Sequence, residues 1–255
     1  MRPHASSAAL PPDKAKLAAA LRADLARLIA LRTAIASNPA DAIDRRRLRA
    51  WQAARLSRTY ADLLASPRYR PAAEFFLSDL YGAHDPSRRE ADMAQVVPVF
   101  ARMMPVGALR TISLAVHLDM LSEEMDRAIV LALRGEGGPG ALEALEEARY
   151  AQAFRGAGAQ AGRREQIALT GEIGASLDRL TKLPAIGTAV RFMRVPAAAM
   201  GFSELHGFLD RGFRAFRNMG DASVFLATVR RRESAILERL LAGDPQPFAL
   251  RPEKD

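Results

Sequence analysis

The sequence predicts an all-α protein, a multi-helix bundle that closes with a C-terminal helical hairpin. Apolar residues recur every three or four positions through most of the 255-residue chain, which is the spacing that gives a helix one apolar face. Stretches in which apolar and polar residues alternate, as they do in a half-buried strand, are almost absent. We therefore expect about eight to ten helices packed around one core.

The expected organisation is one helical domain between two short ends. Residues 1–12 are small, polar and proline-bearing and are expected to be disordered, residues 13–242 to form the domain, and residues 243–255 to be a tail. Glycine-rich linkers are expected near residues 135–140 and 156–162. The first contains the spacing G-x-G-x-x-G. Because a predicted helix rather than a strand precedes it, we interpret it as a linker and not as a dinucleotide site.

Prolines, glycines and apolar stripes set the expected helix bounds. The helices are expected at about residues 13–37, 41–65, 71–81, a short segment broken near Pro98, 105–134, 141–154, 163–182, 183–194, 203–218 and 221–242. Apolar residues surround the helix at 105–134 on nearly every side, so we expect it to lie at the centre.

Several sets of side chains are expected in the core. The first helix presents the stripe Leu17, Leu21, Leu25, Leu28 and Ile35. The second presents Leu48, Gln52, Leu56, Tyr60 and Leu63, with arginines on its other sides. In the hairpin, Leu205, Leu209, Phe213 and Phe216 are expected to face Phe225, Val229, Ile236 and Leu240. Burial is also expected for Phe76, Leu80, Leu114, Leu118 and Leu121.

The segment Arg68–Asp92 concentrates aromatic, acidic and basic residues. In its predicted helix Phe75 points away from the apolar stripe that contains Phe76, and toward the side of Asp79. Two interpretations stay open: a packed corner in which carboxylates pair with arginines, or a ligand site. The residues of that candidate ligand site are Phe75, Asp79, Tyr81 and His84.

The octapeptide FFLSDLYG (residues 75–82) is followed by the pattern D-x-x-R-R-x-x-D (residues 85–92). Together they resemble the signature of an uncharacterised family of helical proteobacterial proteins with an FFLxDLYG motif. The run MRVPAAAMGFSELHGFLDRGFRAFRNMG (residues 193–220) resembles the C-terminal half of the same family. The resemblance spans about Arg47 to Leu241. It implies a grouping, with no activity or catalytic residue to transfer.

The chain carries a net charge of +8, but arginine far outnumbers lysine and alanine is frequent, as is typical of a GC-rich genome. The charge therefore supports a nucleic-acid partner only weakly, and nucleic acid is not an expected partner. Residues 119–147 carry eight acidic side chains and two arginines. This acidic middle is complementary to the basic flanks, which can hold the fold together or pair two copies of the chain.

The chain contains no cysteine, which excludes disulfides, zinc–thiolate sites and cysteine nucleophiles. The N-terminus lacks the apolar core of a signal peptide, and no uncharged run approaches the roughly 18–20 residues of a transmembrane helix. We therefore expect a soluble, cytoplasmic bacterial protein that is not an integral membrane protein.

Four histidines, at positions 4, 84, 117 and 206, are the candidates for metal or haem chemistry. The helical di-iron pattern needs a glutamate three residues before a histidine, and Tyr81, Leu114 and Ser203 occupy those positions. The H-E-x-x-H, Walker and G-x-S-x-G motifs are absent. We expect no metal, haem or other cofactor, and we interpret Glu123-Glu124 and Glu146-Glu147 as solvated pairs on exposed helices.

Arginines form the main candidate binding surface. Arg211, Arg214 and Arg217 recur every three residues and trace a ridge along one helix, and the predicted partner helix carries Arg230, Arg231 and Arg232. Guanidinium groups hold phosphates and carboxylates through paired hydrogen bonds. We expect this basic face either to take an external anionic partner or to pair with the acidic middle.

These observations favour a non-enzymatic binding or scaffold protein for a protein or anionic partner, with homo-oligomerisation left open. One alternative is an enzyme with a helical pocket beneath Tyr81, in which Asp79 and a histidine, His84 or His117, transfer protons. Another is peripheral membrane attachment through the apolar segment 183–202. A polar-lined pocket touching Asp79 and a histidine would favour the enzyme. Exposure of Met193, Val195 and Met200 beside Arg191 and Arg194 would favour the membrane.

Overall fold

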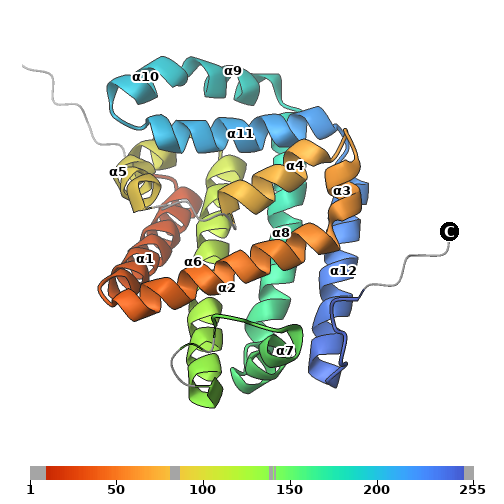
Figure 1. The fold of residues 1–255 in the computed structure, drawn as a ribbon. Helices are drawn as coiled ribbons and strands as arrows, with labels where there is room; N and C mark the ends of the chain where they lie inside the picture. The colour runs from red at the N-terminus through yellow and green to blue at the C-terminus, as the bar shows by residue number, and fades with distance from the viewer. Residues whose placement is uncertain (1–9, 81–86, 138–139, 141, 250–255) are drawn as a thin grey trace, which may run out of the picture.

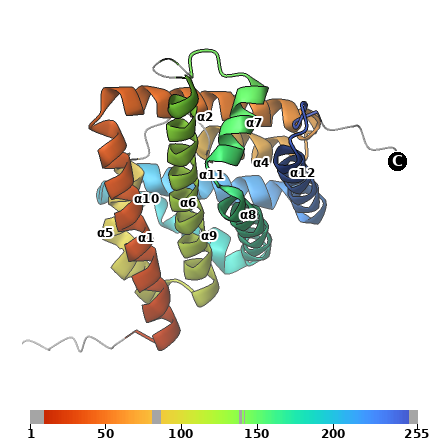
Figure 2. The same ribbon diagram turned by 90° about the horizontal axis from the view of Figure 1, so that it is seen from below.

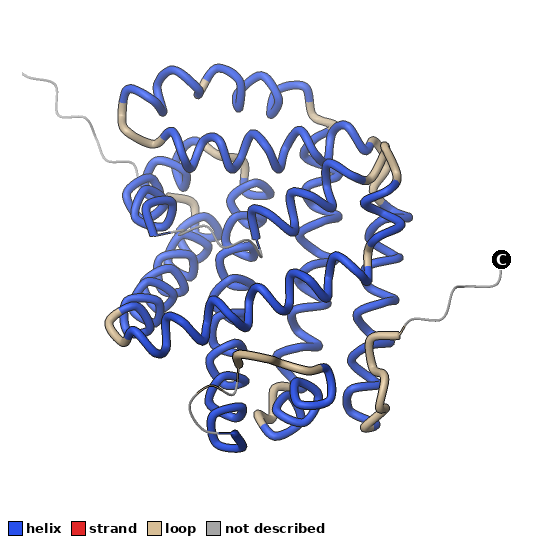
Figure 3. The backbone as a smooth tube through the Cα atoms, viewed as in Figure 1, coloured by secondary structure: helices blue, strands red, loops and turns tan. Residues whose placement is uncertain are grey.

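The computed structural model describes residues 10–80, 87–137, 140 and 142–249, and every regular element within those residues is helical (Figure 1; Figure 3). The predicted all-α class is confirmed. In chain order the elements are α1 (Pro12–Ala36), α2 (Pro39–Thr59), α3 (Ala61–Ala65), α4 (Arg70–Phe75), the π-helical segment η1 (Phe76–Leu80), α5 (Ser87–Met103), α6 (Val106–Gly137), α7 (Glu147–Gly156), α8 (Gln160–Thr181), α9 (Pro184–Phe192), α10 (Arg194–Ala199), α11 (Ser203–Met219) and α12 (Ser223–Ala242).

The long helix α6 lies at the centre, as its apolar surface predicts. It packs against α1, α2, α7 and α8, and Figure 2 shows it between α1 and α8. Leu109 and Leu133 on it are fully buried. Leu114, Leu118 and Leu121 are only half-buried, which corrects the prediction. Polar and charged side chains of α6 take several of its most buried positions instead.

Helix α2 begins at the break that the sequence predicts. The side chain of Asn38 caps it by accepting a hydrogen bond from the amide of Ala40 at 3.0 Å, and Pro39 occupies the first turn, where a missing N–H costs nothing. The helix crosses in front of α6 and α8 in Figure 1. Its predicted buried side is confirmed, although the chain breaks at Tyr60 into a separate short helix, α3.

Pro98 lies inside α5 rather than at a break, which corrects the prediction. Proline removes one backbone hydrogen bond from a helix. Val97 and Ala101, on either side of it, are fully buried in a cluster that α5 shares with α1. Packing therefore outweighs the lost hydrogen bond, and the helix continues.

The last two helices, α11 and α12, follow each other through a turn at Gly220 (φ 76°) but do not pack along their length. Phe216 and Phe225, near the turn, share one apolar cluster. Leu205 lies in the cluster with α1 and α5, and Ile236 in the cluster with α2, α6 and α7. The expected facing of these two stripes is wrong, because α12 runs at a steep angle to α11 and packs on α8 (Figure 1).

The segment around Phe75 and Phe76 departs from a regular α-helix. Helix α4 ends at Phe75 and continues as η1, in which each turn holds an additional residue. That residue shifts the spacing, so both rings pack inward. The ring centre of Phe75 lies 5.4 Å from that of Phe208, and the centre of Phe76 lies 6.1 Å from that of Phe225. The sequence predicts Phe76 as the buried ring, whereas the structure buries Phe75 more completely.

The predicted ends and the first predicted linker fall partly outside the described residues, at 1–9, 138–139, 141 and 250–255. Helix α6 continues to Gly137, into the first predicted linker, and α7 and α8 are separated within the second. In the predicted tail, Phe248 packs edge-on against Trp51, with ring centres 5.7 Å apart. The beginning of the tail is thus part of the packed structure.

The contact between α4 and α11 gives a test of this packing. A Cβ added at Gly212 of α11 would lie 2.9 Å from Cζ of Phe75. We expect Gly212→Ala to lower the free energy of unfolding by about 1–3 kcal/mol, because the packed ring cannot retreat. In the control, Gly171→Ala of α8, the added Cβ meets no described neighbour within 4 Å, and the free energy should rise by up to about 1 kcal/mol. Urea unfolding measures both, and equal stability of the two variants would contradict the placement of Phe75.

Candidate functional site

Glu123 lies near the middle of α6 and is completely buried (0% exposed). Arg32 of α1 donates a hydrogen bond to it at 2.7 Å, and Arg45 and Arg49 of α2 donate to the same carboxylate. An ionised carboxylate is stable in a protein interior only when it is paired and hydrogen-bonded. These three guanidinium groups therefore compensate for its burial.

Burial by itself would raise the pKa of Glu123. The hydrogen bond from Arg45 and the charges of Arg49 and Arg32 together outweigh burial and lower that pKa to about 2. A carboxylate held ionised in this way is a poor proton acceptor at neutral pH. Glu123 is therefore a structural anion, and its interpretation as a solvated residue is wrong.

The network around Glu123 extends along α6. Arg32 also binds Asp119, at 2.7 Å, and Glu90 of α5. Asp126 accepts a hydrogen bond from Gln52 of α2 at 2.8 Å, and burial raises the pKa of Asp126. Charged and polar side chains of α1, α2 and α5 thus meet on α6. The acidic middle pairs with the N-terminal arginines inside one chain.

A second buried carboxylate, Glu233, lies where α2, α8 and α12 meet. Arg55 and Tyr60, from the C-terminal end of α2, each donate to it at 2.8 Å, and Arg163 of α8 donates to its other oxygen. Burial opposes ionisation, but the charges of Arg55 and Arg163 outweigh it and lower the pKa of Glu233 to about 2. Burial and the adjacent carboxylate raise the pKa of Tyr60, so its hydroxyl stays a donor.

Sequence reasoning missed these buried charges although their spacing marks them. Arg32 falls on the apolar stripe of α1, four residues after Leu28 and three before Ile35. Glu233 fills the equivalent gap in the apolar stripe of α12. A charged residue where helical spacing calls for an apolar one indicates a buried ion pair, because its burial requires a partner.

The predicted arginine ridge on α11 is exposed and makes separate local contacts. Arg211 donates to Asp79 of η1 at 3.0 Å, and Arg214 pairs with Asp210 one turn earlier on the same helix. Arg217 extends its guanidinium group over an aromatic ring of α11. The acidic middle is paired with α1 and α2 instead, so the expected pairing of the ridge with it is wrong.

The predicted arginines of α12 have different surroundings. Arg232 forms a bidentate pair with Asp62 of α3, with both hydrogen bonds 2.7 Å long. Arg230 and Arg231 are exposed. Because α12 runs at a steep angle to α11, the two arginine sets do not form the continuous face that a hairpin would give (Figure 1).

The predicted corner site is brought together only in part. Phe75 is buried in an aromatic cluster, and Asp79 is paired with Arg211, as a packed corner requires. Tyr81 and His84 lie outside the described residues. The Asp79–Arg211 pair is thus one carboxylate–arginine pair of the kind that the packed-corner interpretation predicts.

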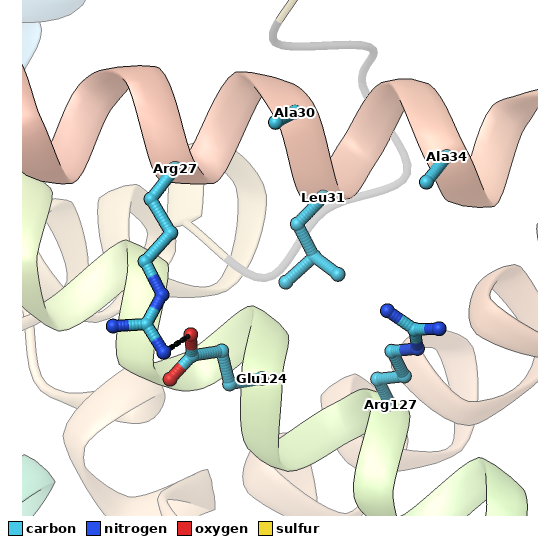
Figure 4. Close-up of a pocket in the computed structure, with 6 residues that line it drawn as sticks. All are labelled: Arg27, Ala30, Leu31, Ala34, Glu124 and Arg127. Carbon is cyan, nitrogen blue, oxygen red and sulfur yellow. Dashed lines mark ion pairs between the residues drawn. The ribbon is translucent and has the colours of Figure 1, made fainter.

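A pocket lies on other elements, between α1 and α6 (Figure 4). It has a volume of about 410 Å³ and is lined by Arg27, Ala30, Leu31, Ala34, Glu124 and Arg127. Arg27 and Glu124 form an ion pair of 2.5 Å at one end of it. Neither Asp79 nor a histidine lines this pocket, so it does not match the one expected for the enzyme alternative.

Two of the predicted histidines lie within the described residues. Half-buried His117 of α6 lies between Asp24 of α1, 3.0 Å from Nδ1, and Glu165 of α8, 3.2 Å from Nε2. His206 of α11 donates from Nε2 to the carbonyl of Val190 in α9 at 2.7 Å. Within the described part of the chain, no three metal-ligating side chains converge on one point.

The α9–α10 segment lies outside α11 in Figure 1 and carries large apolar side chains into solvent. These side chains, with their exposed fractions, are Leu183 (51%), Phe192 (77%), Met193 (37%), Val195 (76%) and Met200 (56%). Arg191 and Arg194 are exposed beside them. This is the exposure that favours the membrane alternative. None of the described helices is both long and apolar enough to span a bilayer.

A family model described as Domain of unknown function (DUF8198) matches residues 32–247. The matched region contains both buried carboxylates and the whole α9–α10 segment. No curated protein and no solved structure matches the chain.

Two adjacent glutamates on α6 test the role of the buried network. We expect Glu123→Gln to lower the free energy of unfolding by about 3–5 kcal/mol, because it leaves buried arginines without their counter-charge. Glu124→Gln removes an ion pair whose Arg27 side chain is 65% exposed and should cost at most about 1 kcal/mol. Urea unfolding of both variants provides the comparison. Similar losses in the two would show that burial of Glu123 does not govern stability.

The lowered pKa values of Glu123 and Glu233 predict a loss of stability in acid. Each pKa falls from 4.5 to about 2 on folding, so the stabilisation is complete above about pH 4.5 and is lost as the pH falls toward 2. Within that window each carboxylate should contribute about 1.4 kcal/mol per pH unit to the free energy of unfolding. Urea unfolding at about pH 7, 4.5 and 3 measures this dependence. The variant Glu233→Gln should flatten it, and an unchanged slope would contradict the assignment.

Proposed function

The chain belongs to the DUF8198 family, and because the description of that family names no activity, we propose a function from the surface of the chain itself. We propose that it is a non-enzymatic binding protein that attaches to an anionic partner through the outer face of α9–α10. The predicted cytoplasmic location is part of this proposal.

A second apolar stripe on α9–α10 supports this function. Ile186, Val190 and Ala197 are half-buried or buried on the inner side. The outer side carries Ala185, Thr188, Phe192, Val195 and Ala199, which follow a spacing of three and four and are all exposed. Backbone hydrogen bonds from Met193 to Ala189 and from Ala197 to Met193, 3.0 and 2.9 Å long, carry the helical path across the junction. A helix that is apolar on both sides calls for a partner on its second side.

The charge around this stripe favours an anionic partner. Residues 183–203 contain Arg191 and Arg194 and no aspartate or glutamate, whereas Lys182, just before them, is paired with Asp178 at 2.7 Å. Arg217 of α11 adds a further cation, since its Nη1 would lie 3.7 Å from a Cβ built at Gly187 of α9. By helical spacing, Arg191 lies at the edge of the outer stripe, three residues after Thr188 and four before Val195. Arg194 is exposed, but its spacing places it nearer to the inner side. The result is an apolar face with a basic border.

The carboxylates favour binding over catalysis. Glu123 and Glu233 are held ionised by buried arginines, and Asp79 is engaged by Arg211. A general base must reach a substrate proton and have a pKa near the working pH. Glu123 and Glu233 are buried and ionised and meet neither need, whereas a binding surface on α9–α10 leaves their ion pairs undisturbed.

Velocity sedimentation of the tagged chain in a native cell extract tests the proposed function. We expect the wild-type chain to sediment faster in the extract than the purified chain at the same concentration, because its partner is attached. The double variant Phe192→Ser/Val195→Ser should sediment like the purified chain, with an unchanged thermal melt because both side chains are exposed.

The matched control places the same change elsewhere. Leu131 of α6 and Val224 of α12 are 56% and 58% exposed, so Leu131→Ser/Val224→Ser removes exposed apolar surface outside α9–α10 and should sediment like the wild type. The proposed function is wrong if the wild-type chain sediments in the extract as it does when purified, or if both double variants lose the partner equally.

A further inference from the structure

We infer that the anionic partner is the surface of a lipid bilayer, in which α9–α10 lies flat with its outer apolar stripe directed into the acyl region. This inference rests on the proposed function. A helix that lies in the membrane interface has one apolar side and basic residues at the level of the headgroups, and it does not span the bilayer. The α9–α10 segment combines the exposed side chains of Phe192 and Val195 with the exposed arginines Arg191 and Arg194.

The chemistry of the outer stripe favours lipid over a protein partner. Of its five residues, Thr188 is the one with a side chain that can form hydrogen bonds. Protein interfaces carry about one hydrogen bond per 100–200 Å² along with their apolar contacts. Acyl chains offer no hydrogen-bonding groups and require none. A stripe of alanine, phenylalanine and valine therefore matches the acyl region, and the arginine side chains can extend to the phosphates.

Charge repulsion argues against a second copy of the chain as the partner that binds the outer stripe. In a two-fold symmetric dimer the same patch faces itself, so Arg191 and Arg194 would meet their own copies with no carboxylate in residues 183–203 to compensate. Nucleic acid is disfavoured for a different reason. A phosphate backbone would pair with the arginines but would leave the exposed side chains of Phe192 and Val195 without an apolar partner, which acyl chains supply.

The segment is already fixed to the body of the protein. His206 of α11 holds the carbonyl of Val190 at 2.7 Å. The absence of a side chain at Gly187 lets α9 approach Phe213, whose Cζ would lie 3.2 Å from an added Cβ. Because these contacts hold the inner side on α11, the outer stripe is presented without any need to fold on the membrane. The helix content of the chain should therefore stay constant on binding.

Flotation with defined vesicles tests the inference on the full purified chain. The probes are vesicles of phosphatidylcholine alone and vesicles in which about one third of the lipid is phosphatidylserine. We expect the wild-type chain to float with the anionic vesicles, and the bound fraction to fall at high salt, because the screening length shortens from about 10 Å at 0.1 M to about 3 Å at 1 M. Phe192→Ser/Val195→Ser should weaken the binding at least about tenfold.

Two further variants separate the electrostatic contribution to vesicle binding from the apolar contribution. Arg191→Gln/Arg194→Gln should weaken binding to the anionic vesicles and reduce its dependence on salt. Leu131→Ser/Val224→Ser should bind like the wild type. Circular dichroism of each variant without lipid checks that the fold is retained. The inference is overturned if the wild-type chain fails to float with anionic vesicles, or if it floats equally well after the Phe192 and Val195 substitutions.

The sedimentation experiment distinguishes this inference from the proposed function. If the wild-type chain sediments with a partner in the extract but does not bind anionic vesicles, the partner is a macromolecule, and the lipid inference alone is wrong. Failure in both experiments overturns the proposed function as well. Binding to anionic vesicles, together with loss of the fast-sedimenting species after membranes are cleared from the extract, supports both.

Discussion

The ion pairs of Glu123 restrict how α1, α2 and α6 can be arranged. Leaving a buried carboxylate without its partners costs about 3–5 kcal/mol. Sliding α1 or α2 by one helical turn would separate Arg32 or Arg45 from Glu123, with which both are hydrogen-bonded. Apolar side chains by themselves tolerate such shifts better, because one methyl group replaces another at a similar distance. The charged contacts therefore select one register among several that apolar packing would allow.

Helix α2 joins the two buried networks. Its first half supplies Arg45 and Arg49 to Glu123 of α6, and its second half supplies Arg55 to Glu233 of α12. A single helix thus connects the N-terminal helices to the last helix of the chain. Arg45, Arg49 and Arg55 of α2 thus serve the interior of the fold, although by composition they look like part of a solvated basic surface.

Helical class and most helix positions follow from the sequence because they depend on local spacing, proline and glycine. The buried side of α2, from Leu48 to Tyr60, is predicted correctly on that basis. The angle between α11 and α12 is not, because both stripes are apolar and spacing alone does not say which other helix each will meet. Phe75 is misplaced because a π-helical segment changes the spacing that the prediction assumes. The sequence allowed exposure of the apolar segment 183–202 to be stated as one alternative. It could not decide between that alternative and burial, because whether another helix covers the second side of α9–α10 depends on the tertiary arrangement.

The net charge of +8 is a poor guide to the binding surface, and the internal pairs explain why. Arg32 of α1 and Arg45 and Arg55 of α2 are neutralised by buried carboxylates of α6 and α12, so the charge of these three arginines does not reach a partner. Arg191 and Arg194 are the two cations of residues 183–203, and no acidic residue lies in that segment to compensate for them. A partner responds to the local field within about one Debye length, roughly 10 Å at 0.1 M salt, and not to the total charge of the chain. A short basic segment beside an uncovered apolar stripe therefore affects binding more than the many arginines that hold the fold together.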